Sequence, residues 1–342
     1  MRRVEAATLL TLLLAAAGAL TLQNARGTSI ASRGARSGAQ EPGRAAQLAA
    51  RATDARRTGR SGPREYACPI LPASNPLNRD ISHNSVDPRS SSYIASIGAR
   101  LHLHADFGAN PHYGIPFAVV PRSQPKVPVA FTEFGEESDP GPYPIPANVP
   151  VEGAGEGGDR HVLIVQQGAC RLYELYRAAP HGAGWQAGSG AAFNLRSNAL
   201  RPDGWTSADA AGLPIFPLLA RYHEVVRAGA IDHALRVTVA RTQRGYIHPA
   251  THFASSRRDP SLPPMGLRLR LKASFSLAGY HGQALVVLRA LRRYGLIVAD
   301  NGSSWFITGA PDPRWNEADL DQLKTVPGSA FEAVRSGPIL HG

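Results

Sequence analysis

The chain has 342 residues, of which 43% are hydrophobic, so it can bury a large core and is not disordered throughout. Its formal net charge of +11 lies mostly near the N-terminus. Residues 26–64 hold nine arginines and two acidic residues and residues 1–25 contribute +1, which leaves +3 for residues 65–342. A folded region so near neutrality gives no support for nucleic-acid binding.

Residues 1–25 have the order of features that is typical of a secretory signal peptide. Arg2 and Arg3 precede an uncharged run at residues 6–22, which contains "LLTLLLAAAGAL" and small residues at 17–19. This run is slightly shorter than the roughly 20 apolar residues that span a bilayer, so retention as a membrane anchor is the alternative. We expect cleavage, a secreted protein in the periplasm or outside the cell, and no membrane association afterwards.

Residues 26–64 are rich in Arg, Ala, Gly and Ser and lack apolar periodicity, so we expect a disordered linker before a single domain at residues 65–342. The sequence contains only two cysteines, Cys68 and Cys170. In an exported chain two cysteines are more often joined than free, which predicts a disulfide between them. Two buried thiols are the alternative if the chain is not exported.

From residue 66 onward, short alternating segments predict strands in "YGIPFAVVP", "KVPVAFTEF", "HVLIVQQGACRLYELYRA", "GSGAAFNLRS", "IDHALRVTV" and "MGLRLRLKASF". Helices are expected at residues 91–97, in part of 207–229, and at 281–295, where Gly295 ends the last one. The stretch "LIVADNGSSWFITG" at 296–309 predicts a tight hairpin at Asn301-Gly302. Without a βαβ rhythm, this order favours an antiparallel β-sandwich, jelly-roll-like and decorated by two or three helices.

The segment 136–159 holds so many Pro and Gly residues that neither a helix nor a central strand can persist in it. Internal loops of this length are usually functional or disordered. We expect this one to form the wall of a binding cleft.

Four longer phrases carry a resemblance: "AAFNLRSNALRPDGWTSADAAGLPI", "IDHALRVTV", "PPMGLRLRLKASF" and "YGLIVADNGSSWFITGAPDPRW". Together they resemble an uncharacterised family of secreted bacterial proteins, over roughly residue 68 to the C-terminus. The resemblance implies export and a single structural unit. It implies no activity, catalytic residue or cofactor.

One candidate constellation is a metal site. His102, His104 and Asp106 alternate, so an extended strand would place all three on one face, and two imidazoles with a carboxylate suit Zn²⁺ or a similar ion. His248 and His252 are close in sequence, but the intervening Pro249 argues against a helix that would bring them together. Ordinary surface or hydrogen-bonded histidines are the alternative.

The second constellation places carboxylates beside aromatic residues in Gly-rich turns, which is a typical combination in sugar-binding sites. Glycoside hydrolysis needs two carboxyl groups. We choose Asp300 first, with Asp106, Glu137, Asp139 and Asp203 as possible partners, and we expect the substrate to contact Trp305, Trp205, Trp185, Asn301 and Arg314. The alternative is that the acidic residues close turns and the aromatic rings seal the core.

His233 lies in "IDHALRVTV" on the same predicted face as Ile231 and Leu235, so it points inward. It is a hydrogen-bonded core residue, or a general acid or base if that face opens into the cleft.

These patterns predict an exported protein that hydrolyses a polysaccharide or cell-wall glycan with paired carboxylates. A non-catalytic carbohydrate-binding module and a metal-dependent hydrolase built on His102, His104 and Asp106 remain alternatives. Neither a phosphate-binding P-loop nor a dinucleotide fingerprint occurs in the sequence, so we expect no cofactor.

Overall fold

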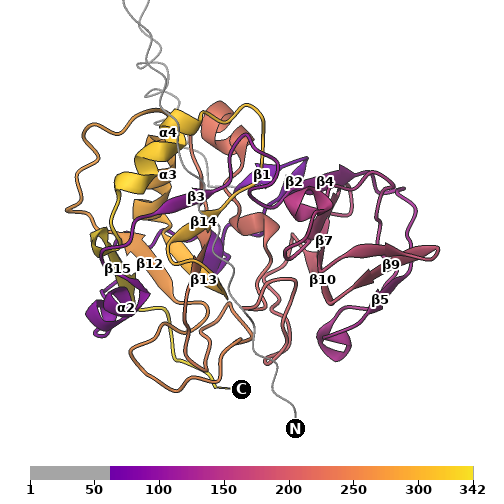
Figure 1. The fold of residues 1–342 in the computed structure, drawn as a ribbon, viewed down its shortest axis with the longest axis horizontal. Helices are drawn as coiled ribbons and strands as arrows, with labels where there is room; N and C mark the ends of the chain where they lie inside the picture. Colours follow the sequence, from indigo (N-terminus) through magenta and orange to yellow (C-terminus); the bar gives the residue numbers. More distant parts are fainter. Residues whose placement is uncertain (1–61, 342) are drawn as a thin grey trace, which may run out of the picture. The chain divides into compact units, whose positions relative to one another are not determined.

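Four sheets organise the protein, and the computed structural model describes them within residues 62–341 (Figure 1). The predicted signal peptide and residues 26–61 of the predicted linker lie outside this range. The prediction of a mainly β protein with several helices is confirmed. The finer prediction of an antiparallel sandwich or jelly roll is not.

The largest sheet has six strands in the order β15-β12-β13-β11-β14-β3. In that order they are β15 (Phe331–Val334), β12 (Arg268–Leu271), β13 (Leu296–Asn301), β11 (Leu235–Val239), β14 (Phe306–Thr308) and β3 (His104–Asp106). Two of its pairings are parallel, β11 with β13 and β14 with β3, and the others are antiparallel.

A four-stranded sheet has the order β10-β7-β6-β4, and a three-stranded sheet has the order β5-β9-β8. Their strands are β10 (Ser189–Asn194), β7 (Arg171–Tyr176), β6 (Val162–Gln166), β4 (Phe117–Val120), β5 (Val129–Phe131), β9 (Gly184–Ala187) and β8 (Ala179–His181). The fourth sheet pairs β1 (Arg64–Glu65) with β2 (Cys68–Pro69). Because β4 pairs with β6 and β5 with β9 in parallel, the expected antiparallel arrangement does not hold for these two pairs.

Strand β6 shows how the four-stranded sheet is buried on both faces. Successive side chains of a strand point to opposite faces. Leu163 and Val165 belong to the large hydrophobic core, whereas Val162 and Ile164 belong to a smaller cluster that also receives side chains from β7 and β9. Burial on both faces explains why the strand reads as an apolar run rather than an alternation.

Three α-helices accompany the sheets in the described part of the chain: α2 (Ser90–Ile97), α3 (Gly282–Arg293) and α4 (Glu317–Asp321). The short helical turns are η1 (Pro76–Asn78), η2 (Gly135–Glu137), η3 (Glu152–Gly155), η4 (Phe216–Leu218), η5 (His223–Ala228), η6 (Gln322–Thr325) and η7 (Gly328–Ala330). The predicted helices at 91–97 and 281–295 are therefore confirmed, and most of the segment 207–229 forms only short turns.

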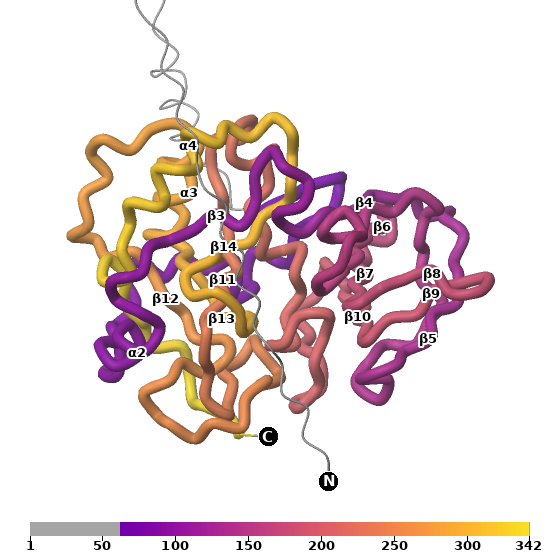
Figure 2. The backbone as a smooth tube through the Cα atoms, viewed as in Figure 1, coloured from indigo at the N-terminus to yellow at the C-terminus, as the bar shows by residue number. Residues whose placement is uncertain are grey.

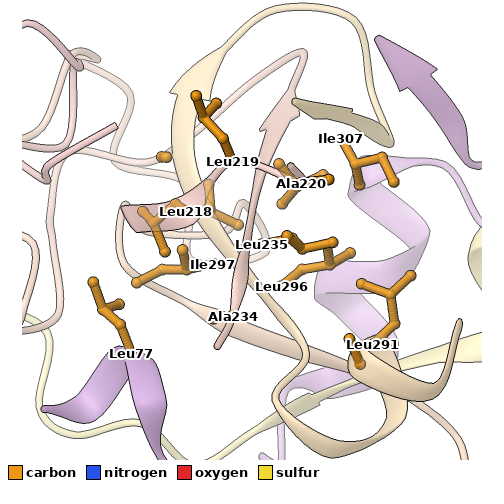
Figure 3. Packing of buried hydrophobic residues seen from close by; sticks show 14 of the residues in the cluster. Leu77, Leu218, Leu219, Ala220, Ala234, Leu235, Leu291, Leu296, Ile297 and Ile307 are labelled. Atoms are coloured by element: carbon orange, nitrogen blue, oxygen red, sulfur yellow. The ribbon is translucent and has the colours of Figure 1, made fainter. Parts of the chain in front are cut away.

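Helix α3 packs its predicted apolar stripe into the large core. Figure 3 shows Leu291 of α3 among buried side chains that include Leu235 of β11 and Leu296 of β13. Gly295 follows the helix at φ 69°, and a Cβ there would approach the Leu269 carbonyl oxygen to 2.2 Å. Only glycine fits this position, because it tolerates positive φ and has no side chain to clash.

The predicted hairpin at Asn301-Gly302 is wrong. Strand β11 lies between β13 and β14, so the two strands pair with β11 and not with each other (Figure 2). The amide of Gly302 donates to the Val239 carbonyl, and the amide of Trp305 donates to the Thr238 carbonyl. The loop therefore crosses the end of β11 and places Asp300 and Trp305 on either side of that strand.

The predicted disulfide between Cys68 and Cys170 is present, with 5.4 Å between the two Cα atoms. It joins β2 to the residue immediately before β7 across 102 positions of sequence. Both cysteines are fully buried. The bridge therefore ties the first strands of the described chain to the core of the four-stranded sheet.

Candidate active site

A polar cavity of about 260 Å³ lies beside the ends of β11, β13 and β14. Six charged or titratable side chains line it: Asp106, Glu152, Asp159, His161, Arg236 and Asp300. They come from β3, β11, β13 and the Pro- and Gly-rich segment with the residues that follow it. The fold thus gathers distant parts of the sequence around one cavity.

Arg236 on β11 organises the floor of this cavity. Its Nε and Nη2 atoms donate to the two carboxylate oxygens of Asp209, each at 2.9 Å. Its Nη2 also donates to Oδ2 of Asp300 at 2.9 Å, and its Nη1 donates to Oγ1 of Thr308 at 2.9 Å. Two-point binding of a carboxylate fixes a guanidinium in position and orientation. Arg236 is therefore a rigid, buried cation beside the Asp300 carboxyl group.

Asp300 holds its proton more tightly than an ordinary aspartate. Burial raises its pKa, the charge of Arg236 opposes that rise, and the nearby Asp209 carboxylate adds to it, so that the pKa is about 6. The side chain keeps 22% of its surface exposed, toward the cavity that it lines. A carboxyl group with these properties can donate a proton near neutral pH.

Glu152 has the opposite electrostatic environment. Its Oε2 lies 2.6 Å from Nδ1 of His161 and also accepts the His161 backbone amide. Burial would raise the pKa of Glu152, but the charge and hydrogen bonds of His161 keep it below the ordinary value. In the same contact, burial would lower the pKa of His161, but Glu152 raises it to about 9. At neutral pH the two form a charged pair.

Asp106 and Asp159 complete the acidic lining. Asp106 is half-buried at the end of β3, and burial raises its pKa while His104 opposes the rise. Asp159 is exposed at the end of the Pro- and Gly-rich segment. Within residues 62–341 the carboxylate oxygens of these two residues accept no hydrogen bond, so they are free to receive hydroxyl groups of a ligand.

The cavity therefore combines carboxyl groups of unlike proton affinity. Asp300 and Asp106 have raised pKa values, whereas Glu152 has a lowered one. At a pH between these pKa values, a carboxyl group with a raised pKa carries a proton while Glu152 stays ionised. Such separation of acid and base among neighbouring groups is a common basis of hydrolytic catalysis.

The structure does not support the expected role of Trp305 as a substrate platform. Its side chain is fully buried, stacks on Phe331 with 5.0 Å between ring centroids, and donates from Nε1 to the Gly98 carbonyl at 2.9 Å. Trp305 belongs to the large hydrophobic core and does not line the cavity, whereas Asp300 does.

Three of the proposed partner carboxylates lie outside the cavity. Asp139 pairs with Arg201 and accepts the Ala192 amide, and Glu137 accepts the Thr206 amide. Asp203 is exposed and pairs with His248. These contacts hold loops in place, so Asp106 is the one proposed partner that the structure brings into the cavity with Asp300.

His233 is a satisfied core residue. Its side chain is fully buried, with Nδ1 2.7 Å from the Ala234 carbonyl oxygen and Nε2 3.2 Å from the Glu224 carboxylate. It does not line the cavity beside Asp300. The possibility that its face opens into that cleft is therefore not supported.

The remaining predicted substrate contacts divide among four places. Asn301 lines the cavity beside Asp300. Trp185 packs against the smaller hydrophobic cluster, and Trp205 lies under the Arg201 guanidinium at 5.6 Å. Arg314 lies on the ring of Tyr222 beside a second cavity.

The alternative metal site on His102, His104 and Asp106 has no support in the described residues. His102 precedes β3 and is exposed, and His104 stacks on Phe306 with 4.2 Å between ring centroids. Within residues 62–341, His, Cys, Asp and Glu side chains form no group of three placed to hold a metal ion.

No pattern in the sequence points individually to Glu152, His161, Asp209 or Arg236. The Pro- and Gly-rich composition of 136–159 marked the region of Glu152 as functional, but not the residue. Alternation along "IDHALRVTV" predicts that Arg236 points away from the core, yet the side chain is buried because Asp209 and the neighbouring strands cover that face. The periodicity of a strand cannot show that a residue from elsewhere in the chain covers one of its faces.

The chain matches no known family model, no curated protein and no solved structure. Helices in the described range are all too short or too polar to cross a membrane.

Proposed function

We propose that this protein is an exported hydrolase that cleaves a glycosidic bond in a polysaccharide or cell-wall glycan. The observation that carries the proposal is the cavity in which Asp300, with its raised pKa, and Glu152, with its lowered pKa, both line the same space. Glycoside hydrolysis needs a carboxylic acid to protonate the leaving oxygen and an ionised carboxylate to act as nucleophile or base.

In this proposal Asp300 is the general acid and Glu152 the ionised partner. Burial raises the pKa of Asp300 to about 6, so the group holds its proton to a much higher pH than an ordinary aspartate, and Arg236 fixes the orientation of its carboxyl group. His161 holds Glu152 through Oε2. Asp106, with its unoccupied oxygens, is positioned to bind a sugar hydroxyl at the same cavity.

The ligand class follows from the balance of charge in the cavity. Arg236 is neutralised by Asp209, and His161 by Glu152. Asp106 and Asp159 then add further acidic groups without adding a cation. Such a lining repels phosphate and carboxylate ligands and offers acceptors to hydroxyl groups, which favours a neutral glycan.

Export supports a substrate outside the cytoplasm. The disulfide is the structural feature that agrees with it, because disulfides persist mainly in oxidising compartments. The N-terminal features that predict secretion lie outside the described residues.

The test is a screen of the purified protein for release of reducing ends from soluble and cell-wall polysaccharides. We expect Asp300→Asn and Glu152→Gln each to reduce turnover at least ~10²-fold on the substrate found, as for loss of a positioned acid or base. Asp203→Asn, an exposed carboxylate outside the cavity, is the matched control and should retain turnover. Full activity of Asp300→Asn, or no cleavage of any glycan, would reject the proposal.

A further inference from the structure

A second cavity of about 190 Å³ is built from a different set of side chains. Its lining includes Tyr66, Phe117, Arg221, Tyr222, Asp312 and Arg314. Residues 115 and 308 line the first cavity, and residues 116 and 310 line the second. The same two short chain segments, at 115–116 and 308–310, therefore contribute to both cavities. The second cavity is a neighbour of the proposed active site.

Tyr66 is held at this cavity by anchors on both sides in sequence. Glu65 is buried, with Oε2 2.9 Å from Nε of Arg221, and Cys68 is locked in the disulfide. Between them, Tyr66 has a positive φ of 48° and leaves 37% of its surface exposed, with its ring 5.8 Å from that of Phe117. A bulky residue in this backbone region is strained, and strain persists where the surroundings enforce it.

The charges at this cavity are matched in pairs. Arg221 pairs with Glu65 and also with Glu224, at 2.6 Å. Both oxygens of Asp312 accept from Arg314, at 2.7 and 2.6 Å. Because each of these two guanidinium groups already has a carboxylate partner, the described lining offers no unpaired arginine to an anionic ligand.

Flat surfaces and polar edges remain available to an uncharged ligand. The Arg314 guanidinium lies 4.3 Å from the centre of the Tyr222 ring, which holds both groups in place. Tyr66 presents a partly exposed ring beside them. An aromatic ring packs on the C–H face of a sugar, while hydroxyl groups of the sugar bind nearby donors and acceptors.

We propose that this second cavity is a binding subsite for an uncharged sugar residue of a glycan, with the Tyr66 ring as its stacking surface and the Arg314–Asp312 pair as its polar edge. The assignment of a sugar as the ligand rests on the proposed function. The site itself consists of residues that do not line the proposed active site. It explains why the chain fixes an exposed tyrosine between two buried anchors.

Binding is measured by calorimetry in the Asp300→Asn protein, so that cleavage does not interfere. The probes are cellohexaose, laminarihexaose, mannohexaose, maltohexaose and chitohexaose. For the probe that binds, we expect Tyr66→Ala to weaken binding about tenfold and Tyr66→Phe to retain most of it, because the ring supplies the contact. Arg314→Ala should weaken binding several-fold.

The matched control is Tyr113→Ala, which removes an exposed tyrosine outside both cavities and should leave binding unchanged. A thermal melt of each variant shows that its fold is intact. If Tyr66→Ala and Arg314→Ala bind as Tyr113→Ala does, or if no probe binds, the subsite is rejected.

Different results would reject the subsite and the proposed function. Glycan cleavage that is unaffected by Tyr66→Ala at all substrate concentrations would keep the function and reject the subsite. Probe binding that depends on Tyr66, in a protein that cleaves none of the glycans, would keep the subsite and reject the hydrolase.

Discussion

Oδ2 of Asp300 lies 2.9 Å from Nη2 of Arg236, yet Asp300 is the weaker partner of that guanidinium. Asp209 accepts two hydrogen bonds from Arg236 and is fully buried, so it neutralises most of the charge. The remaining attraction does not offset the cost of burying an ionised Asp300, and the pKa of Asp300 rises to about 6. Arg236 therefore orients the Asp300 carboxyl group, while the pKa of that group stays above the ordinary aspartate value.

The pH dependence of catalysis follows from that pKa. If Asp300 donates the proton, kcat/KM should fall as the pH rises above about 6, and should also fall in acid as Glu152, with its lowered pKa, becomes protonated. The measurement is a pH profile of hydrolysis on the substrate identified by the screen. A rate that increases steadily from pH 6 to 9 would exclude Asp300 as the acid.

The stability of the protein should depend on the charge of His161. Its folded-state pKa of about 9 exceeds the ordinary value of 6.5, so the folded state binds the proton more tightly than the unfolded chain. The stabilisation is complete below about pH 6.5 and is lost as the pH rises through 9, with a magnitude of about 3 kcal/mol. Urea unfolding at a series of pH values measures it.

His161→Gln is the control for this pH dependence, because glutamine can hydrogen-bond to Glu152 without titrating. We expect this variant to lose the decline in stability between about pH 6.5 and 9. Equal slopes in the two proteins would contradict the assignment to His161.

Trp305 should prove to be a core residue. Trp305→Ala removes a fully buried ring and its hydrogen bond to Gly98, so we expect the free energy of unfolding to decrease by roughly 3–5 kcal/mol. Trp205→Ala removes a partly exposed ring and should cost much less. Denaturant unfolding compares the two variants, and an unchanged midpoint for Trp305→Ala would refute the buried position.

Removal of the disulfide should destabilise the protein through the unfolded chain. The bridge closes a segment of 102 residues, for which restriction of the unfolded ensemble is worth about 4–5 kcal/mol. We expect the Cys68→Ser, Cys170→Ser double variant to lose stability of that order in urea unfolding. Thiol titration of the denatured, unreduced wild type should find no free thiol, and two free thiols would contradict the bridge.

Local sequence signals predicted the local structure well. The apolar stripe and Gly295 defined α3, the alternating run at 268–271 formed β12, and the two cysteines formed the disulfide. These features depend on residues close in sequence, or on there being only one possible pairing. The hairpin at Asn301-Gly302 failed because a strand from sixty residues earlier takes the position beside β13.

The candidate site was predictable only where polar residues coincide with the end of a strand. Asp300 was found because it ends a buried run beside a turn signal, and Asp106 because it alternates with histidines. Glu152 and Arg236 were missed, since their importance comes from His161 and Asp209, which lie elsewhere in the sequence. The pKa differences that suggest chemistry arise from these contacts and cannot be read from residue type.

Because β11 lies between β13 and β14, the native sheet differs from the hairpin that the local sequence favours. Asn301-Gly302 between two apolar runs is the signal of a strand that folds directly back on its neighbour. The native sheet excludes that direct pairing, because β11 occupies the place between the two strands. The local preference of this segment and its place in the native sheet therefore disagree, which makes the segment locally frustrated at the rim of the proposed active site.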